Sequence, residues 1–187
     1  MTMNGSKVSN YLKTKINDRN VLLKEGNFVL NSGEISPFYF DFSKFSDSEG
    51  LVELGFVIWT EIHEMKVLPD VIFGVATKGI ILVSSACLYS YIFGDNHKDY
   101  NLSFAFDRKE NFKQHGEKGD YVGCDLRNKS VLIVDDVFVT GKAIRKSLNL
   151  VKRYTQDISI MVMINRSEIE EIDGYPVKSI LSFPKDF

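Results

Sequence analysis

The sequence predicts an α/β fold in which a mostly parallel central sheet is flanked by helices. Runs of apolar, mostly β-branched residues at 71–75, 131–134 and 158–164 are typical of buried parallel strands. The first two runs are each followed by a short polar loop and then by apolar residues at helical spacing. Alternation of strand, loop and helix is typical of a parallel sheet covered by helices.

The composition is that of one ordinary globular domain. The chain has 187 residues, of which 44% are hydrophobic and 26% are charged, and this suffices for a single core. Its 23 basic and 25 acidic residues give a net charge of −2, so no overall positive field favours nucleic acid or an anionic membrane surface as a partner. Any binding of anions must therefore be local.

Two features favour a cytoplasmic protein. Cys87 and Cys124 are the only cysteines and provide neither a disulfide framework nor a zinc-binding spacing, which agrees with a reducing compartment. Residues 1–15 lack the apolar core of a signal peptide, and the run at 79–93 is too short and too rich in Ser and Tyr to span a bilayer. We therefore expect no membrane association.

The N-terminal part should form a helix followed by two short strands. Apolar residues within 8–23 follow helical spacing loosely, and Gly26 ends this helix. Residues 28–41 contain two strand-like stretches around the turn at Ser32 and Gly33. Four aromatic side chains lie close to that turn: Phe28, Phe38, Tyr39 and Phe40. These rings fit either the core or a wall on which a planar base stacks.

A helix and a strand-loop-helix unit should follow. Asp47 or Ser48 can cap a helix that runs to about Met65. Its buried face should carry four apolar residues: Leu51, Leu54, Ile58 and Ile62. The strand at 71–75 then leads through a short loop with Lys78 into another helix. A lone lysine in a loop is usually solvated, but on the carboxyl edge of a parallel sheet it is a better candidate for a phosphate partner.

A long loop is expected after the strand at 102–106. Residues 107–120 have mixed charge, two glycines and little periodicity, which predicts a mobile segment. This segment is either an exposed, solvated hairpin or a lid that closes over a polyanion and excludes water. A lid would bring four basic or titratable side chains to the site: Arg108, Lys109, Lys113 and His115.

The stretch 131–144 has the order of elements found in phosphate sites. Its strand is followed by Asp135 and Asp136, and a short loop with Thr140 and Gly141 then opens a helix. Inward-pointing loop N–H groups and a helix N-terminus together attract an anion. The carboxylates would repel that anion, but they suit ribose hydroxyls or a hydrated Mg²⁺ ion, which suggests a phosphorylated ribose. The alternative is that they only end a strand and cap the next helix.

Arg166 also falls at the carboxyl end of a strand. It follows the strand at 158–164, and its planar fork can hold a carboxylate by two parallel hydrogen bonds. A final strand is expected at 177–181. Lys78, the two aspartates and this arginine should therefore meet at one edge of the sheet.

These motifs, in this order, resemble those of the orotate phosphoribosyltransferases over nearly the whole chain. The segment 131–143 is similar to the phosphoribosyl pyrophosphate signature of type I phosphoribosyltransferases. The orotate branch is indicated by shorter motifs: Ser32-Gly33, Ser36-Pro37-Phe38-Tyr39-Phe40, Lys78-Gly79-Ile80, Arg108-Lys109-Glu110 with His115-Gly116-Glu117, and Arg166. The resemblance implies a single domain over 1–187 with the type I fold. It includes a helix and a small hood over about 1–45 and a mobile catalytic loop at 108–120.

The resemblance implies a reaction, a cofactor and an oligomeric state. The chain should transfer the 5-phosphoribosyl group from phosphoribosyl pyrophosphate to orotate, giving orotidine 5'-monophosphate and pyrophosphate in pyrimidine nucleotide synthesis. Mg²⁺ is the expected cofactor, bound through the substrate and near Asp135 and Asp136 rather than by dedicated protein ligands. Because the mobile loop of this family typically serves the neighbouring subunit's site, a homodimer with shared active sites is expected.

The resemblance also implies where each part of the substrates binds. Asp135 and Asp136 should bind the ribose hydroxyls. The main chain of the following residues should bind the 5'-phosphate: Val137, Phe138, Val139, Thr140, Gly141, Lys142 and Ala143. The pyrophosphate should meet residues of two loops: Thr77, Lys78, Arg108, Lys109, Lys113 and His115. The orotate pocket should be lined by Tyr39 and Phe40, with Arg166 on the carboxylate or carbonyl edge of the base.

The expected catalytic residues are Lys78, Lys109, His115, Asp135 and Asp136. They suit an oxocarbenium-like transition state, in which the charge of the leaving group must be neutralised and no protein nucleophile is needed.

Several residues depart from the family pattern. Asn31 stands where the family usually has Lys, Val139 where Thr is usual, and Lys142 where a small hydroxyl residue is usual. The expected mobile loop is one residue longer than the common pattern, which leaves the register of Lys113 open. These departures motivate one alternative, a phosphoribosyltransferase-fold protein that binds or senses a nucleotide without chemistry. A second alternative is a phosphoribosyltransferase that acts on a different base.

Overall fold

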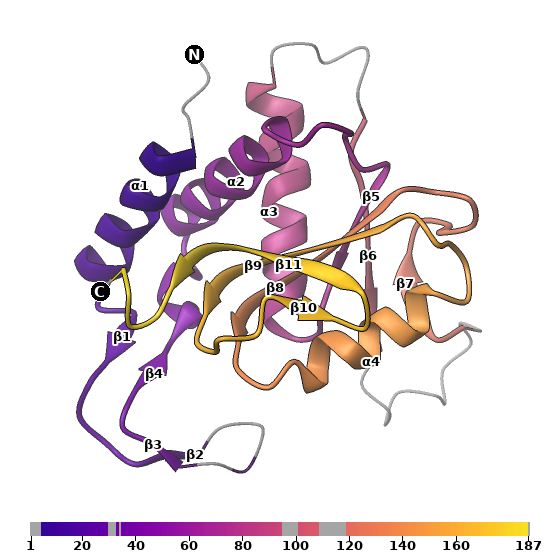
Figure 1. Ribbon diagram of the computed structural model, residues 1–187. Coiled ribbons are helices and arrows are strands. Elements are labelled where there is room, and N and C mark those ends of the chain that lie inside the picture. The colour runs from indigo at the N-terminus through magenta and orange to yellow at the C-terminus, as the bar shows by residue number, and fades with distance from the viewer. Residues whose placement is uncertain (1–4, 30–32, 34, 95–100, 109–118, 187) are drawn as a thin grey trace.

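The structure, a computed structural model, describes residues 5–29, 33, 35–94, 101–108 and 119–186 (Figure 1). Its centre is a seven-stranded sheet in the spatial order β10-β11-β9-β8-β5-β6-β7. The strands are β5 (Val71–Gly74), β6 (Ser103–Asp107), β7 (Tyr121–Gly123), β8 (Val131–Phe138), β9 (Ile158–Asn165), β10 (Glu171–Ile172) and β11 (Tyr175–Ser182). The central strands are parallel and the edge strands β7 and β10 are antiparallel. The predicted α/β fold is confirmed.

The direction of winding reverses between β5 and β8, which are neighbours in the sheet. From β5 the chain continues outward to β6 on one side, and from β8 it continues outward to β9 on the other. Ligands of open parallel sheets bind at such a reversal, outside the carboxyl ends of the strands. The loops that follow β5 and β8 are therefore the expected location of a ligand site.

Helices cover both faces of the sheet (Figure 1). The helices are α1 (Gly5–Asp18), α2 (Ser48–His63) and α3 (Lys78–Phe93) on one face, and α4 (Lys142–Val151) on the other. The side chains of β8 point alternately to the two faces of the sheet, and each face has its own hydrophobic core. Leu132 and Val134 belong to the core beneath α1, α2 and α3, whereas Val131 and Ile133 belong to the core beneath α4. Because both faces are buried, the strands show unbroken apolar runs.

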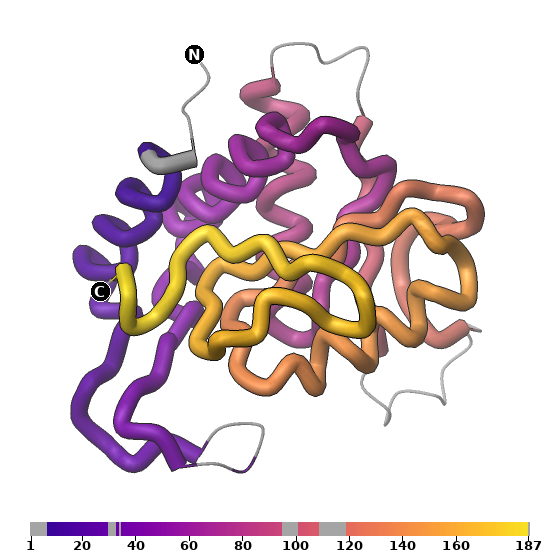
Figure 2. Tube along the Cα trace, in the orientation of Figure 1, coloured from indigo at the N-terminus to yellow at the C-terminus, as the bar shows by residue number. Residues whose placement is uncertain are grey.

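An arm extends from the end of α1 away from the sheet (Figure 2). We call the described residues within 22–40 the hood. It contains two short antiparallel pairs: β1 (Leu22–Leu23) with β4 (Tyr39–Phe40), and β2 (Phe28–Val29) with β3 (Ile35–Ser36). A short 3-10 helix, η1 (Phe42–Phe45), then leads into α2.

Some predicted boundaries are wrong. β8 continues through both aspartates to Phe138, because its pairing with β9 extends to Phe138 and Asn165, so the aspartates lie within the strand. The first helix ends at Asp18 because residues 22–23 pair with β4. The edge strands β7 and β10 were not predicted, since two or three residues carry too little pattern. On α2 the predicted cap is confirmed, because the Asp47 side chain accepts a hydrogen bond from the N–H of Gly50.

Two glutamates of α2 are buried, which the apolar pattern did not predict. Glu53 is 5% exposed and forms ion pairs with Lys15 at 2.7 Å and Arg19 at 2.6 Å, which join α1 to α2. Glu61 pairs in the same way with Lys178 of β11 at 2.6 Å. By contrast Leu51, predicted to be buried, is 38% exposed.

No helix in the part of the chain that the structure describes is long and apolar enough to cross a membrane. Both cysteines are free and half-buried. Burial raises the pKa of the Cys87 thiol to about 12, so this thiol stays protonated and unreactive at neutral pH.

Candidate active site

The loop between β8 and α4 forms a turn suited to an anion. Val139 and Thr140 lead to Gly141, whose φ of +72° is a left-handed conformation that favours glycine. A Cβ at this position would meet the side chains of Ile172 and Phe138, each at 2.9 Å. α4 begins with the next residue, so the N–H groups of its first turn and its positive dipole end lie at the carboxyl edge of the sheet. The N–H of Lys142 lies 3.4 Å from the hydroxyl oxygen of Thr140.

The residues around this turn differ in what they can offer a phosphate. Val137 and Phe138 lie in β8 and pair with β9, and the Phe138 carbonyl accepts a hydrogen bond from the N–H of Arg166 at 2.8 Å. Their main chain is thus partly engaged in the sheet, and binding of the 5'-phosphate through 137–143 stays a prediction. The side chain of Lys142 is exposed, as is that of Ala143. An exposed ammonium group at the first turn of α4 can add positive charge without filling the turn.

Asp135, which is buried, and Asp136, which is half-buried, are adjacent near the carboxyl end of β8. The Asp135 side chain is 7% exposed, and its Oδ1 accepts a hydrogen bond from the N–H of Asp136 at 3.0 Å. Burial raises the pKa of Asp135 well above its usual value, and the Asp136 carboxylate raises it further. Burial also raises the pKa of Asp136. Two crowded carboxyl groups of this kind favour a ligand that brings hydroxyl donors or a cation.

This crowding predicts that Asp135→Asn stabilises the fold. Because the folded-state pKa of Asp135 is raised, its stabilising contribution is full below the unfolded pKa and is lost as the pH rises through the folded pKa. The neutral amide avoids that loss, so the thermal midpoint at pH 7 should rise by roughly 2–4 °C, the effect of about 1 kcal/mol in a domain of this size. Thermal unfolding between pH 4 and 7 without magnesium should show the gain shrinking as the pH falls. A variant that is less stable at pH 7 would contradict this reading.

Lys78 begins α3 in the loop after β5, beside the aspartate pair. Its ammonium Nζ lies 3.7 Å from Oδ1 of Asp41, and its charge acts to lower the pKa of Asp136. Thr77, the preceding residue, is exposed. The structure therefore brings the predicted pyrophosphate loop and the predicted ribose site together.

Asp41 was missed by the sequence reasoning. It follows the hood strand β4, and the hydroxyl of Ser43, the main chain of Ser43 and then Lys78 lower the pKa of this carboxyl. Burial, followed by the Asp41 and Asp136 carboxylates, raises the pKa of Tyr39, which places that ring close to both groups. The hood therefore reaches the carboxyl edge of the sheet. A single acidic residue after an aromatic strand gives no sequence signal for this contact.

Arg166 connects the end of β9 to the hood. Its guanidinium donates from Nη2 to the Ser36 hydroxyl at 2.8 Å and from Nη1 to the Phe38 carbonyl at 3.2 Å. The guanidinium carbon lies 6.0 Å from the centre of the Phe40 ring and 5.8 Å from that of Phe183. These contacts fix the orientation of the arginine at the site edge.

The two predicted base-pocket aromatics differ in position. Tyr39 is half-buried and its ring stacks on Phe28, with centroids 5.6 Å apart. Phe40 is only 2% exposed and packs edge-to-face on Phe183 in the main core. Phe40 is therefore a core residue, and its ring also lies beneath the Arg166 guanidinium. Contact of either ring with a base stays a prediction.

Part of the predicted site lies outside the described residues, namely Lys109, Lys113, His115 and the unusual Asn31. Arg108 is described, is half-buried and follows directly after β6. The main chain joins the two ends of the predicted loop, because the N–H of Arg108 donates a hydrogen bond to the Asp120 carbonyl at 3.4 Å. The predicted catalytic loop at 108–120 thus starts and ends at the carboxyl edge.

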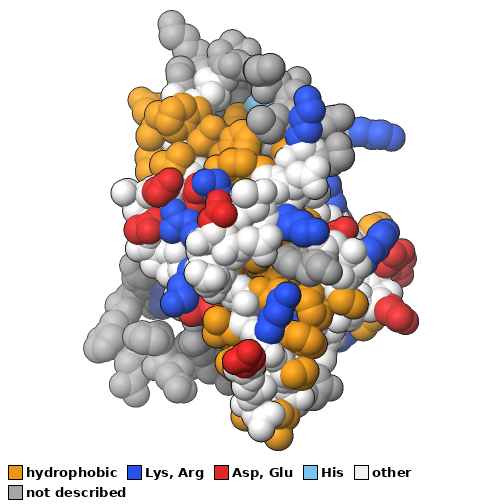
Figure 3. All heavy atoms as spheres, turned by 90° about the vertical axis from the view of Figure 1, so that its left-hand side faces the viewer, with side chains coloured by type: hydrophobic (Ala, Val, Ile, Leu, Met, Phe, Trp, Pro, Cys, Tyr) orange, Lys and Arg blue, Asp and Glu red, His pale blue; other side chains and the backbone are white. Residues whose placement is uncertain are grey.

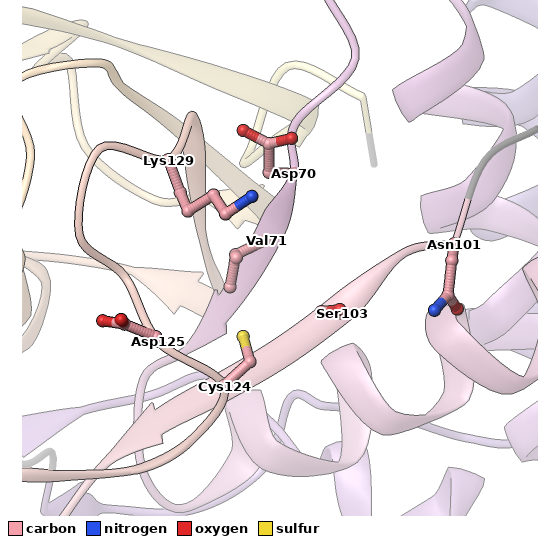
Figure 4. A pocket seen from close by; sticks show the side chains of 7 residues that line it. All are labelled: Asp70, Val71, Asn101, Ser103, Cys124, Asp125 and Lys129. Atoms are coloured by element: carbon pink, nitrogen blue, oxygen red, sulfur yellow. The ribbon is translucent and has the colours of Figure 1, made fainter.

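A cavity of about 250 Å³ lies at the opposite edge of the sheet (Figure 4). Its walls come from the amino-terminal starts of β5 and β6 and from the loops beside them: Asp70, Val71, Asn101, Ser103, Cys124, Asp125 and Lys129. The Asp70 carboxylate is already used, because it accepts hydrogen bonds from the N–H and the hydroxyl of Ser130. None of the predicted site residues lines this cavity.

Among the residues that the structure describes, no three His, Cys, Asp or Glu side chains converge so as to hold a metal ion alone. Asp135 and Asp136 supply hard oxygen atoms at the site edge, and these fit Mg²⁺, which is usually held by one or two carboxylates, water and substrate phosphates. A magnesium ion here would thus be shared between protein and substrate.

Comparison with known proteins agrees with this geometry. Residues 53–187 match the family described as "Phosphoribosyl transferase domain". An orotate phosphoribosyltransferase of Buchnera aphidicola is 38% identical over 149 residues, covering 79% of this chain and 67% of the relative, and one of Pseudomonas savastanoi is 36% identical over 177 residues, covering 88% and 80%. The crystal structure of an orotate phosphoribosyltransferase of Francisella tularensis superposes with a TM-score of 0.69 at 30% identity, covering 92% and 86% of the two chains.

Proposed function

Since the chain belongs to the orotate phosphoribosyltransferase family, we propose that it transfers the 5-phosphoribosyl group from phosphoribosyl pyrophosphate to orotate. The products are orotidine 5'-monophosphate, a precursor of pyrimidine nucleotides, and pyrophosphate. One observation carries the proposal: the paired carboxylates and the α4 turn stand beside Lys78 at the point where the winding of the sheet reverses. The two free cysteines agree with a cytoplasmic location.

The reaction breaks the bond between ribose C1 and a pyrophosphate oxygen, and the electron pair leaves with pyrophosphate. A ring nitrogen of orotate then forms the new bond to C1 and loses its proton, which the departing pyrophosphate can accept. Asp135 and Asp136 accept hydrogen bonds from the ribose hydroxyls, and the α4 turn holds the 5'-phosphate. Lys78 and Thr77 meet the pyrophosphate, where a positive charge stabilises the leaving group in the transition state. Mg²⁺, bound mainly through the substrate, supplies further positive charge there.

Arg166 selects the base in this proposal. Its guanidinium is held by Ser36 and Phe38 and stands over two aromatic rings, so it is fixed before a base arrives. Such a fork can pair with the carboxylate of orotate, a group that uracil and the purines lack. The test is to incubate the protein with phosphoribosyl pyrophosphate, magnesium and one base at a time. Turnover of orotate well above that of uracil or adenine supports the proposal, and preference for another base contradicts it.

A homodimer is part of the proposal. Leu88, Tyr91 and Ile92 share one side of α3 and are 60%, 70% and 50% exposed. A stripe of large apolar side chains on a helix is typical of a surface that a partner covers. On the face of the molecule that carries α1, hydrophobic side chains gather above interspersed charges of both signs (Figure 3). A second copy of the chain is the partner that the family resemblance favours.

Introducing two negative charges among the exposed apolar residues Leu88, Tyr91 and Ile92 of α3 should separate the two subunits. We expect the wild type to sediment at twice the chain mass of 21.3 kDa and Leu88→Glu/Ile92→Glu to sediment as a monomer, because burying two carboxylates in an apolar interface is costly. Ile169→Glu is the matched control, since Ile169 is 42% exposed at another site. A double variant that remains dimeric would place the interface elsewhere.

A further inference from the structure

A buried carboxylate that the proposed reaction does not use stands beside the site. Asp107 is the last residue of β6 and is 8% exposed. Its Oδ1 accepts a hydrogen bond from the N–H of Ala76 at 2.6 Å, and its Oδ2 accepts one from the hydroxyl of Ser147 at 3.1 Å. Ser147 is fully buried within α4. A buried carboxylate with a hydrogen-bond partner on each oxygen holds the two partners in place relative to each other. Without the carboxylate, each partner would be a polar group that lacks its hydrogen bond.

The two partners belong to the two phosphate-binding elements. Ala76 lies in the loop between β5 and α3 and is followed directly by Thr77 and Lys78. Ser147 lies in the helix whose N-terminus follows the Gly141 turn. These elements flank the point where the winding of the sheet reverses. Among the main-chain hydrogen bonds of the described residues, none joins the loop at 75–77 to α4, whereas the Asp107 side chain links the two directly.

We propose that Asp107 is a positioning residue that sets the spacing between the pyrophosphate loop and α4. This inference rests on the proposed function, in which the loop holds one end of phosphoribosyl pyrophosphate and the α4 turn holds the other. A ligand that spans both elements needs the correct spacing, whereas a ligand that occupies one element does not. Loss of the link should therefore weaken the spanning ligand selectively.

Calorimetry with two ligands tests this selectivity. For Asp107→Ala, we expect the affinity for phosphoribosyl pyrophosphate with magnesium to fall by about 10- to 100-fold, the order of effect of losing one hydrogen bond to a charged group. Affinity for ribose 5-phosphate, which occupies only the α4 side, should stay near that of the wild type. Ser147→Ala removes one of the two hydrogen bonds, so its affinity for phosphoribosyl pyrophosphate should lie between those of the wild type and Asp107→Ala. In Asp107→Asn the amide oxygen can still accept from Ala76 and the NH₂ can donate to Ser147, so much of the affinity should return.

Asp70→Ala is the matched control. Asp70 also accepts one main-chain N–H and one serine hydroxyl, both from Ser130, but it lies at the opposite edge of the sheet (Figure 4). Its loss should leave the affinities for both ligands unchanged.

Two results would overturn the inference. One is wild-type affinity for phosphoribosyl pyrophosphate in both Asp107→Ala and Ser147→Ala. The other is an equal loss of affinity for both ligands in Ser147→Ala and in Asp107→Asn, which would indicate a purely structural role. These outcomes are separate from failure of the proposed function, because binding of phosphoribosyl pyrophosphate needs no base. A wild type that binds this ligand without consuming orotate would contradict the function and leave the positioning role standing.

Discussion

Replacing both Asp135 and Asp136 by Asn should lower kcat/KM for phosphoribosyl pyrophosphate by about three orders of magnitude. Each carboxylate that accepts a hydrogen bond from a ribose hydroxyl contributes about 1.5–3 kcal/mol, and each 1.36 kcal/mol corresponds to a factor of ten in rate. The fold should survive, because burial already disfavours the charged form of both groups. Initial rates at varied concentrations of phosphoribosyl pyrophosphate, together with thermal unfolding, measure both effects.

Asp70→Asn/Asp125→Asn is the control for that double variant. It also replaces two carboxylates by amides, but at residues that line the cavity at the opposite edge of the sheet (Figure 4). Its kcat/KM should match the wild type. If both double variants lost activity equally, overall charge and not the position of the carboxylates would be responsible.

Gly79→Ala should reduce both stability and activity. A Cβ at Gly79 would meet the Val134 carbonyl oxygen at 2.8 Å and the carbonyl carbon of Gly74 at 2.9 Å. The Val134 carbonyl cannot move freely, because it accepts a hydrogen bond from the N–H of Val75 at 3.0 Å. We expect the free energy of unfolding to fall by about 1–3 kcal/mol, as for other overpacked sites.

The loss of activity should be larger than the loss of stability suggests. Gly79 follows Lys78 directly and faces the Val134 carbonyl, which precedes Asp135 in β8, so the methyl group should push the pyrophosphate loop and Asp135 apart. A displacement of about 1 Å can lower the rate by about 100-fold. Urea unfolding and initial rates measure the two effects. Gly174→Ala is the control: its φ is +88° and no heavy atom lies within 4 Å, so backbone strain should cost roughly 1–2 kcal/mol and leave the rate unchanged.

The sheet and the parts of the site on it could be predicted because their signals are local. An apolar run followed by charged residues and a helix start specifies a strand end, and parallel strands bring such ends to one edge. Lys78, Asp135 and Arg166 were predicted at the same edge for this reason, and the structure has them there. The type I fold and the family were confirmed as well.

The remaining contacts depend on distant residues and leave no local pattern. Asp107 ends an apolar strand and reaches Ser147, 40 positions away. Asp41, directly after the hood strand β4, contacts Lys78 of α3, which is distant from it in the sequence. Glu53 occupies a buried position of α2 that the helical pattern predicts to be apolar, because Lys15 of α1 and Arg19 directly after α1 neutralise its charge. Phe40 shows the converse, because an aromatic beside a turn proved to be core.

The most direct test of the proposed function is the loss of orotate absorbance with phosphoribosyl pyrophosphate and magnesium. We expect the wild type to consume orotate and to form orotidine 5'-monophosphate and pyrophosphate in equal amounts, and we expect chelation of magnesium to stop the reaction. Turnover no higher than that of Asp135→Asn/Asp136→Asn would contradict the central claim. If calorimetry then showed tight nucleotide binding, the chain would be a binding protein built on the phosphoribosyltransferase fold.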